Sequence, residues 1–247
     1  MADWNEQQRT QQGFGSVPRT GGGLAAGVTF DEGLRKHMLS IYNYMTSGVL
    51  LTGIVALLTA RSGLALSFAS GPLMWLVALS PLAIVFAMSF GANRFSKATL
   101  QMMFWGFAVL MGLSLSTIFL VYTGGSIAAT FFATAAAFAG LSLWGYTTKK
   151  DISAWGSFLI MGVIGLIVAS LINWFLQSPT LYYVVGFLGV LIFAGLTAYD
   201  TQRLKNEYSY YRGTEFAGKA IILGALTLYL DFINMFLFLL RFMGSRE

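Results

Sequence analysis

One acidic residue lies deep inside an apolar stretch of this chain. Asp231 stands in the segment Leu228-Tyr229-Leu230-Asp231-Phe232-Ile233-Asn234, and the apolar run around it extends from Ala220 to Phe242. In a helix that begins at Ala220, Asp231 would lie ~16 Å from its start, close to the middle of a membrane. An ionisable side chain so far from water is costly, and it is therefore a functional hypothesis by default. Asn234, three residues further on, would share its helix face.

A second acid, Asp200, ends another apolar stretch, in the segment Ala198-Tyr199-Asp200-Thr201-Gln202. The apolar count places it near a membrane edge, where it would be an ordinary solvated acid. If its helix continues to about Asn206, Asp200 lies deeper and could approach Asp231. Two carboxyl groups that are close together in a low dielectric titrate as one unit, and when ionised they offer oxygen ligands suited to Ca²⁺. The sequence leaves both positions of Asp200 open.

The composition indicates which elements must hold these acids. Hydrophobic residues make up 56% of the 247 residues, and charged residues make up 10%, where about 25% is usual in soluble domains. So few charges cannot cover the surface of a soluble globule of this size. The same composition excludes a disordered chain and argues against nucleic-acid binding, despite the formal net charge of +5. We predict an integral membrane protein that contacts the lipid bilayer and binds no nucleic acid.

Seven apolar stretches are long enough to cross the ~30 Å hydrocarbon core, which needs about 20 residues of helix. Their apolar runs are continuous, which favours helices over the alternating strands of a barrel. Because the last stretch carries the mid-membrane acid, we expect it at the centre of the bundle. The predicted fold is an all-α integral membrane protein of seven transmembrane helices. The predicted spans are Tyr44–Ala60, Leu73–Phe90, Ala98–Tyr122, Ser126–Tyr146, Ala154–Leu176, Leu181–Tyr199 and Ala220–Phe242.

The chain before the first span is polar. Residues 1–29 are rich in Gln, Gly, Ser and Thr and lack the apolar core of a cleavable signal peptide. We predict a disordered cytoplasmic tail over residues 1–29 and one transmembrane domain over residues 30–247. Residues 29–43 are expected to form a short helix that leads into the first span, with Phe30 and Leu34 facing lipid.

Lys and Arg gather in alternate connections between the spans, and this bias sets the orientation. The expected cytoplasmic connections follow the second, fourth and sixth spans, so the N-terminus is expected in the cytoplasm. Seven spans would then leave the C-terminus outside. Arg241 and Arg246 lie near that end and argue the other way, so a re-entrant last segment stays open. The basic residues of the three connections are Arg94, Lys97, Lys149, Lys150, Arg203, Lys205 and Arg212.

Residue types used in most enzyme sites are scarce in this chain. It contains no cysteine, and its one histidine, His37, lies in the polar N-terminal stretch. The Gly-x-Ser-x-Gly and His-Glu-x-x-His motifs are both missing from the sequence. We therefore expect no enzyme and no bound cofactor.

The two acid-bearing segments resemble the signature segments of the Bax inhibitor family, also called the transmembrane Bax inhibitor motif proteins. The order of seven spans and the Lys149-Lys150-Asp151 loop are also similar, so the resemblance covers the chain from about residue 30 onward. In that family the last helix is surrounded by the other six, and two acids form the pH-sensitive dyad of a calcium leak pathway. By motif, these acids are Asp200 and Asp231.

The resemblance also implies a latch. In the family, a basic residue at the cytoplasmic end of the second span closes the pathway by pairing with the dyad. Arg94 occupies that place here, in Gly91-Ala92-Asn93-Arg94, where bacterial members tend to carry a denser basic run. An ordinary topology signal explains Arg94 equally well.

The function that the resemblance implies is a pH-sensitive calcium leak channel of the bacterial inner membrane. Ca²⁺ would be the permeant ion and a transient ligand of Asp200 and Asp231, with Asn234, Tyr199 and Tyr229 as supporting polar residues. The alternative is a regulator that transports nothing and binds other membrane proteins, since some bacterial members modulate a membrane-bound protease. Ion flux through the purified protein in liposomes separates these two functions.

Overall fold

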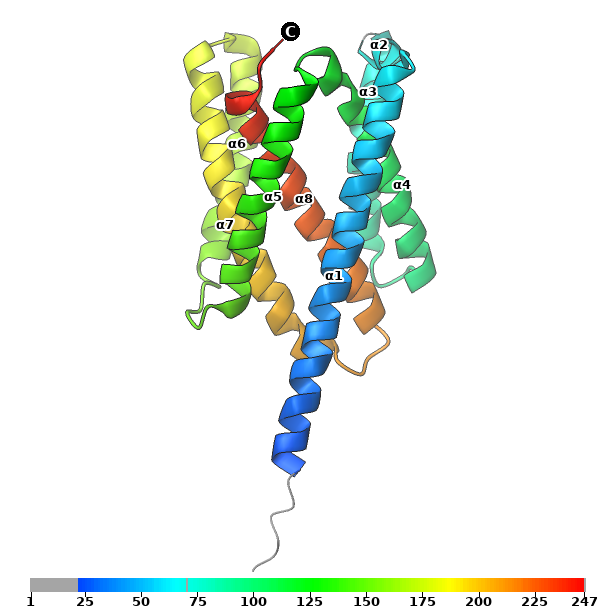
Figure 1. Cartoon of the computed structure of the whole chain (residues 1–247), viewed down its shortest axis with the longest axis vertical. Coiled ribbons are helices and arrows are strands. Elements are labelled where there is room, and N and C mark those ends of the chain that lie inside the picture. The colour runs from blue at the N-terminus through cyan, green and yellow to red at the C-terminus, as the bar shows by residue number, and fades with distance from the viewer. Residues whose placement is uncertain (1–21, 70, 247) are drawn as a thin grey trace, which may run out of the picture.

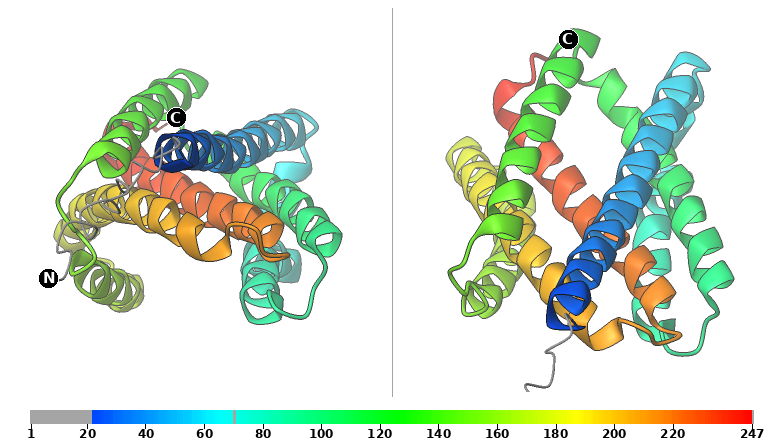
Figure 2. Two further views of the ribbon diagram at one scale, coloured as in Figure 1. Left: turned by 90° about the horizontal axis from the view of Figure 1, so that it is seen from below. Right: turned by 60° about the horizontal axis from the view of Figure 1, so that its bottom comes forward.

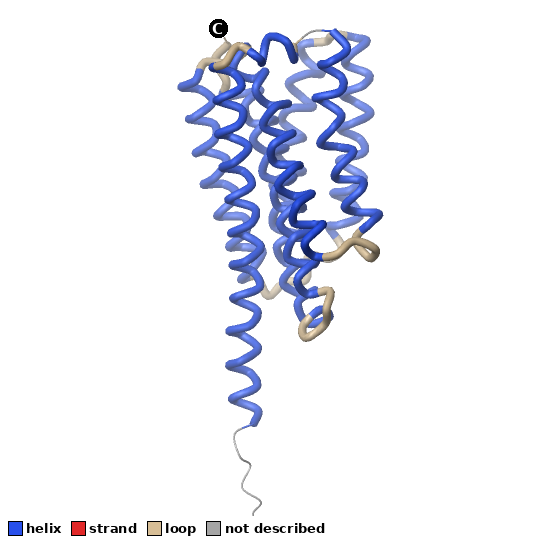
Figure 3. Tube along the Cα trace, turned by 90° about the vertical axis from the view of Figure 1, so that its right-hand side faces the viewer, coloured by secondary structure: helices blue, strands red, loops and turns tan. Residues whose placement is uncertain are grey.

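The described part of the chain is almost entirely helical. The computed structural model describes residues 22–69 and 71–246, with side chains from Glu32 onward. The connections between the helices gather at the two ends of the bundle, and one helix projects far beyond the others at one end (Figure 3). The elements are α1 (Gly22–Arg61), α2 (Leu64–Phe68), α3 (Gly71–Gly91), α4 (Lys97–Leu115), the 3₁₀ helix η1 (Ser116–Leu120), α5 (Gly124–Thr147), α6 (Trp155–Leu176), α7 (Pro179–Tyr211) and α8 (Ala217–Met243).

Seven helical segments within the described residues are long and apolar enough to cross a membrane. They confirm the seven spans and the all-α membrane fold predicted from the sequence. The observed segments are Glu32–Arg61, Gly71–Gly91, Lys97–Leu120, Gly124–Thr147, Trp155–Leu176, Pro179–Tyr211 and Ala217–Met243.

Hydroxyl side chains begin several of these helices. Ser96 accepts a hydrogen bond from the backbone N–H of Thr99 at the start of α4, and Thr123 does the same for Ser126 at the start of α5. Ser178 caps α7, and Pro179 follows it at the first helical position, where no N–H is needed. These caps satisfy backbone donors that lipid could not satisfy.

α8 lies at the centre of the bundle, as predicted. It runs between α7 on one side and α1 with α5 on the other (Figure 2). Within the span window of α8, 61% of the residues are buried inside the protein, against 11% for α6 at the perimeter. Glycines allow some of the close contacts: a side chain at Gly189 of α7 would collide with Phe238 of α8.

The two ends of the helical chain lie at opposite ends of the bundle (Figure 1). α8 is one uninterrupted helix that runs from one end of the bundle to the other (Figure 1), so the re-entrant alternative is not observed. The two arginines that argued for it have local partners. Arg246 donates a hydrogen bond to the Tyr182 hydroxyl at 3.3 Å, and the Arg241 guanidinium lies 5.1 Å from the centre of the Tyr182 ring.

The first helix differs from the sequence prediction. α1 begins at Gly22 and continues without a break to Arg61, so residues 22–29 of the predicted tail are helical. The rest of that tail, residues 1–21, lies outside the described residues. Leu34 is 6% exposed rather than facing lipid, because it shares a buried face with Met38 and Ile41. This face is turned towards the other helices, and the Ile41 side chain lies against Gly224 of α8.

Candidate functional site

Two acids meet inside the bundle where α7 passes α8. Asp200 and Asp231 are each 4% exposed, and their carboxyl groups form a side-chain hydrogen bond. α7 continues to Tyr211, so Asp200 lies in the middle of a helix and not at its end. This settles the alternative that the sequence left open. A hydrogen bond between two carboxyl groups requires that one of them carries a proton to donate, so the contact itself couples the pair to proton uptake.

Arg203 is the cation at this pair. Its Nη1 lies 3.0 Å from Oδ1 of Asp200, and its Nε lies 3.4 Å from Oε1 of Glu207. The Arg203 side chain is 38% exposed whereas that of Asp200 is 6% exposed, so the guanidinium joins a buried acid to a more accessible region. The sequence alone indicated Arg203 only as a topology signal. Arg203 lies three residues after Asp200 and four residues before Glu207, and this helical spacing was the signal that could have identified it.

Two carboxylate oxygens of the pair are buried and accept no hydrogen bond from an N–H or hydroxyl group of the described residues. They are Oδ1 of Asp200, which forms the ion pair with Arg203, and Oδ2 of Asp231. A buried acceptor in this state is unfavourable by about 1–3 kcal/mol. It is therefore available to a proton or a passing cation.

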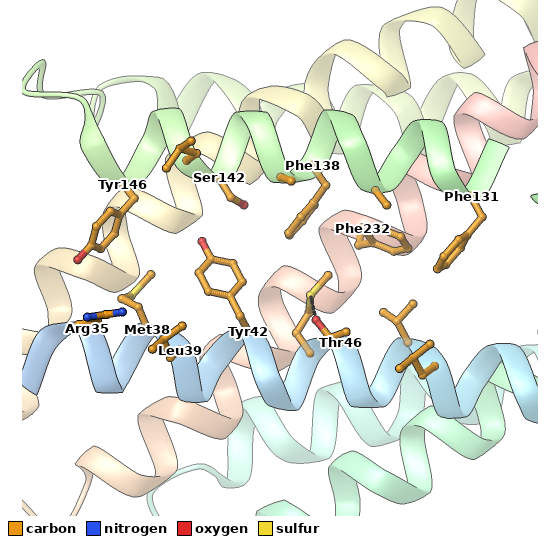
Figure 4. Close-up of a pocket in the computed structure, with 16 residues that line it drawn as sticks. Arg35, Met38, Leu39, Tyr42, Thr46, Phe131, Phe138, Ser142, Tyr146 and Phe232 are labelled. Atoms are coloured by element: carbon orange, nitrogen blue, oxygen red, sulfur yellow. Dashed lines mark hydrogen bonds between the residues drawn. The ribbon is translucent and has the colours of Figure 1, made fainter. Parts of the chain in front are cut away.

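Hydroxyl groups next to the acid pair connect α7 to two further helices. The Thr201 hydroxyl, next to Asp200, donates to Ser142 of α5 at 3.3 Å and lies 3.5 Å from the hydroxyl of Tyr42 of α1. Figure 4 shows Tyr42 and Ser142 pointing towards each other from α1 and α5. The polar site is thus shared by three helices in addition to α8.

Gln202 fixes the connection between α5 and α6 beside the acid pair. Its side-chain amide donates to the carbonyl of Lys150 at 2.8 Å and accepts from the backbone N–H of Ile152 at 3.0 Å. Asp151 lies between them, and its carboxylate accepts from the N–H of Ser153. Two residues after Asp200, therefore, another face of the same helix binds the connection that contains Lys150 and Ile152.

Among the described side chains, the predicted supporting residues contact groups other than the two carboxyl groups. The Tyr229 hydroxyl donates to Thr52 of α1 at 2.6 Å, and Thr52 donates in turn to the carbonyl of Ala108 of α4. The Asn234 amide donates to the Leu230 carbonyl of its own helix. The ring of Tyr199 lies 5.9 Å from the Arg203 guanidinium, so Tyr199 lies beside the cation of the site.

Arg94 lies apart from the pair. It is exposed in the connection between α3 and α4, and its backbone N–H binds the carbonyl of Gly91. Among the described side chains, both ion pairs are formed by Arg203. The latch at Arg94 stays a prediction, and the structure places Arg203 where the predicted latch would have to act.

The site does not provide a resident metal centre within the described residues. No group of three or more acids and histidines there could hold a metal ion. Ca²⁺ takes 6–8 oxygen ligands in its stable sites. Two carboxyl groups could thus make transient contact with a cation but could not replace its hydration shell alone.

The chain is similar to known bacterial membrane proteins. Residues 34–247 match the family model described as "Inhibitor of apoptosis-promoting Bax1". The inner membrane protein YbhL of Escherichia coli K12 is 46% identical over 219 residues, which cover 87% of this chain and 94% of YbhL. An uncharacterised protein of Caulobacter vibrioides is 47% identical over 234 residues, covering 90% and 93% of the two chains. One of Rickettsia prowazekii is 46% identical over 221 residues, covering 89% and 93%.

The matched region includes both acids, Arg203 and all of the observed spans except two residues at the start of the first. A match of this length, together with seven membrane-spanning helices around a central α8, establishes the family as well as the multi-pass membrane architecture. The chain belongs to the Bax inhibitor family of membrane proteins.

Proposed function

We propose that the protein is a pH-sensitive calcium leak channel of the bacterial inner membrane, gated by Asp200 and Asp231. The observation that carries this proposal is the hydrogen-bonded pair of buried carboxyl groups at the crossing of α7 and α8. Removal of the shared proton leaves two negative charges in a low dielectric, and this state needs a cation close by. Arg203 is one such cation, and Ca²⁺ is the permeant ion that would compete with it.

The gate follows from this competition. When the pair holds one proton and Arg203 is bound to Asp200, the charges of the site are nearly balanced. The site then attracts a divalent cation only weakly. Loss of the proton adds a negative charge and strengthens the attraction for Ca²⁺. Arg203 remains attached to α7 through its own side chain, whereas Ca²⁺ can leave. Oδ2 of Asp231, which accepts no hydrogen bond from an N–H or hydroxyl group of the described residues, offers the passing ion a ligand inside α8.

The inner membrane location is proposed from the relative in Escherichia coli, which carries that description. A cytoplasmic N-terminus is proposed from the basic residues of alternate connections. With this orientation the α5–α6 connection and the polar end of α7 face the cytoplasm, so the pair responds to cytoplasmic pH.

Calcium uptake into liposomes tests the function. Purified protein is reconstituted into sealed liposomes that contain a calcium indicator, and uptake is measured from about pH 6 to 8, where a coupled carboxyl pair can titrate. We expect uptake above that of protein-free liposomes and a clear change with pH. Uptake no greater than that of protein-free liposomes across this range would reject the channel and favour the regulator of other membrane proteins.

A further inference from the structure

A large apolar groove lies between α1 and α5, outside the acid pair. Its volume is about 650 Å³, within the ~300–1,000 Å³ range of small-molecule sites. Figure 4 shows its side chains projecting from α1 and α5, with Phe232 of α8 behind them. Both flanking helices pack on α8, and the groove is the space that remains between them.

The groove opens to the side, towards lipid. Its base is formed by buried side chains, among them Met45, Phe138 and Phe232. Its rims are exposed residues of the two helices, such as Leu39 on α1 and Leu143 on α5. Along α1 it runs from Arg35 to Leu50, a length of ~22 Å at 1.5 Å per residue. That length is most of the ~30 Å hydrocarbon thickness.

The two ends of the groove differ in charge. One end is lined by Arg35 and Tyr146, and Lys205 binds the Tyr146 carbonyl at 2.7 Å with its amine 5.1 Å from the centre of that ring. Among the described side chains, no acid forms an ion pair with Arg35. The other end is lined by Leu50 and Phe131 and carries no charge. The groove is therefore cationic at one end and apolar along the rest of its length.

We propose that this groove binds one acyl chain of an anionic phospholipid, with the lipid phosphate at Arg35. Basic pockets between helices at the cytoplasmic surface are a recurring site for anionic headgroups. The chain of the lipid would fill the apolar length between Met38 and Leu50 and would rest on Phe232, the neighbour of Asp231. The bound lipid would also contact Tyr42, whose hydroxyl lies 3.5 Å from that of Thr201, the neighbour of Asp200. The lipid would thus contact Phe232, the sequence neighbour of Asp231, and Tyr42, which lies against the sequence neighbour of Asp200.

Native mass spectrometry of the full chain tests the proposal without reference to calcium. The protein is released from nanodiscs that contain equal parts of phosphatidylglycerol and phosphatidylcholine, and the retained lipids are counted. We expect wild-type protein to retain phosphatidylglycerol about fivefold over phosphatidylcholine, equivalent to ~1 kcal/mol from one basic residue. Equal retention of the two lipids would overturn the proposal.

Two matched pairs of variants locate the lipid. Arg35→Gln should remove the preference for phosphatidylglycerol, and Lys36→Gln, at the exposed neighbouring position, should keep it. Ala139→Trp places a ring in the groove and should lose the retained lipid, whereas Ala137→Trp, exposed on the same helix outside the groove, should retain it. Equal retention by both tryptophan variants, or equal preference in both glutamine variants, would reject the site.

The same spectra report other occupants. A dimer of the wild type that disappears in Ala139→Trp would assign the groove to a second copy of the chain and overturn the lipid proposal. Circular dichroism checks that each variant is helical. If Ala139→Trp does not fold, the comparison of Arg35→Gln with Lys36→Gln still decides, because both residues are exposed near the start of the first span.

Discussion

α6 and α8 are almost equally apolar but occupy opposite positions in the bundle. Their mean hydropathy over the span window is 2.3 and 2.0, yet 11% of the α6 window is buried against 61% of the α8 window. α6 contains no ionisable residue from Trp155 to Leu176, and α8 contains Asp231 and Tyr229 in its buried middle. Hydropathy identifies a span, but the polar side chains decide which span is enclosed, because lipid cannot satisfy them.

The physical reason is the solvent. A leucine gains little by moving from lipid to a helix interface, since lipid tails are equally apolar. A carboxyl or hydroxyl group gains a partner by the same move. In α8 the Tyr229 hydroxyl finds Thr52, and Asp231 finds Asp200. Substitutions that remove polar partners or create cavities should therefore change the stability and the activity of the protein when they are made in α8. Substitutions in α6 should have little effect on either.

The largest effect is expected from the acids. Asp231→Asn keeps the shape of the side chain but cannot exchange a proton, so the pH dependence of calcium uptake should disappear between about pH 6 and 8. Asp200→Asn should do the same, because the two carboxyl groups act as one unit. Ser170→Asn, on the perimeter helix α6, is the control and should behave as wild type. A retained pH response in Asp231→Asn would remove the acid pair from the gate.

The two arginines provide a sharper test of the gate. Arg203→Gln removes the guanidinium that contacts Asp200, so it should raise uptake and shift its pH dependence. The sequence-based latch predicts the same effect for Arg94→Gln, although Arg94 is exposed in the connection after α3. We expect the larger change from Arg203→Gln in the liposome assay. A larger change from Arg94→Gln would restore the latch predicted from the family resemblance.

Shortening a leucine side chain should lower the stability of the protein much more in α8 than in α6. Leu228 of α8 is fully buried, and Leu228→Ala is expected to lower the free energy of unfolding by about 2–5 kcal/mol through the cavity it leaves. Leu171 of α6 is 55% exposed and faces lipid, so Leu171→Ala should change it by less than about 0.5 kcal/mol. Unfolding in mixed micelles measures both variants. Equal losses would contradict the central position of α8.

The smallest effect is expected from a single hydroxyl. Tyr229→Phe removes the bond to Thr52 but leaves Thr52 bonded to Ala108, so the expected loss is about 0.5–1.5 kcal/mol. Tyr183→Phe is the exposed control and should have no measurable effect. The same unfolding measurement applies. A loss of several kcal/mol in Tyr229→Phe would mean that the hydroxyl supports more than this one contact between helices.

Much of the fold could be predicted because apolar length fixes the spans. The end of α7 stayed open because the residues after Tyr199 are mostly polar, yet they continue as helix to Tyr211. Polar residues at the end of a span leave helix and loop indistinguishable by hydropathy. The position of Asp200 and the ion pair of Arg203 depend on that continuation, so the sequence left the first open and missed the second.

The groove between α1 and α5 could not be predicted for another reason. A groove depends on which helices are neighbours and how far apart they lie, and the side chains that line it follow the same apolar pattern as those that pack. Leu34 shows the same limit for a single residue. The sequence predicts that it faces lipid from a short helix, but in the uninterrupted α1 its side chain is buried.

α1 has 40 residues, which gives a rod of ~60 Å, about twice the thickness of the hydrocarbon core. Its first turns project from the bundle beyond the other helices (Figure 1). The projecting turns, Tyr42 and one wall of the groove thus belong to a single helix that contains no proline. A tilt of the projecting turns that is transmitted along this helix would change the width of the groove beside the two acids.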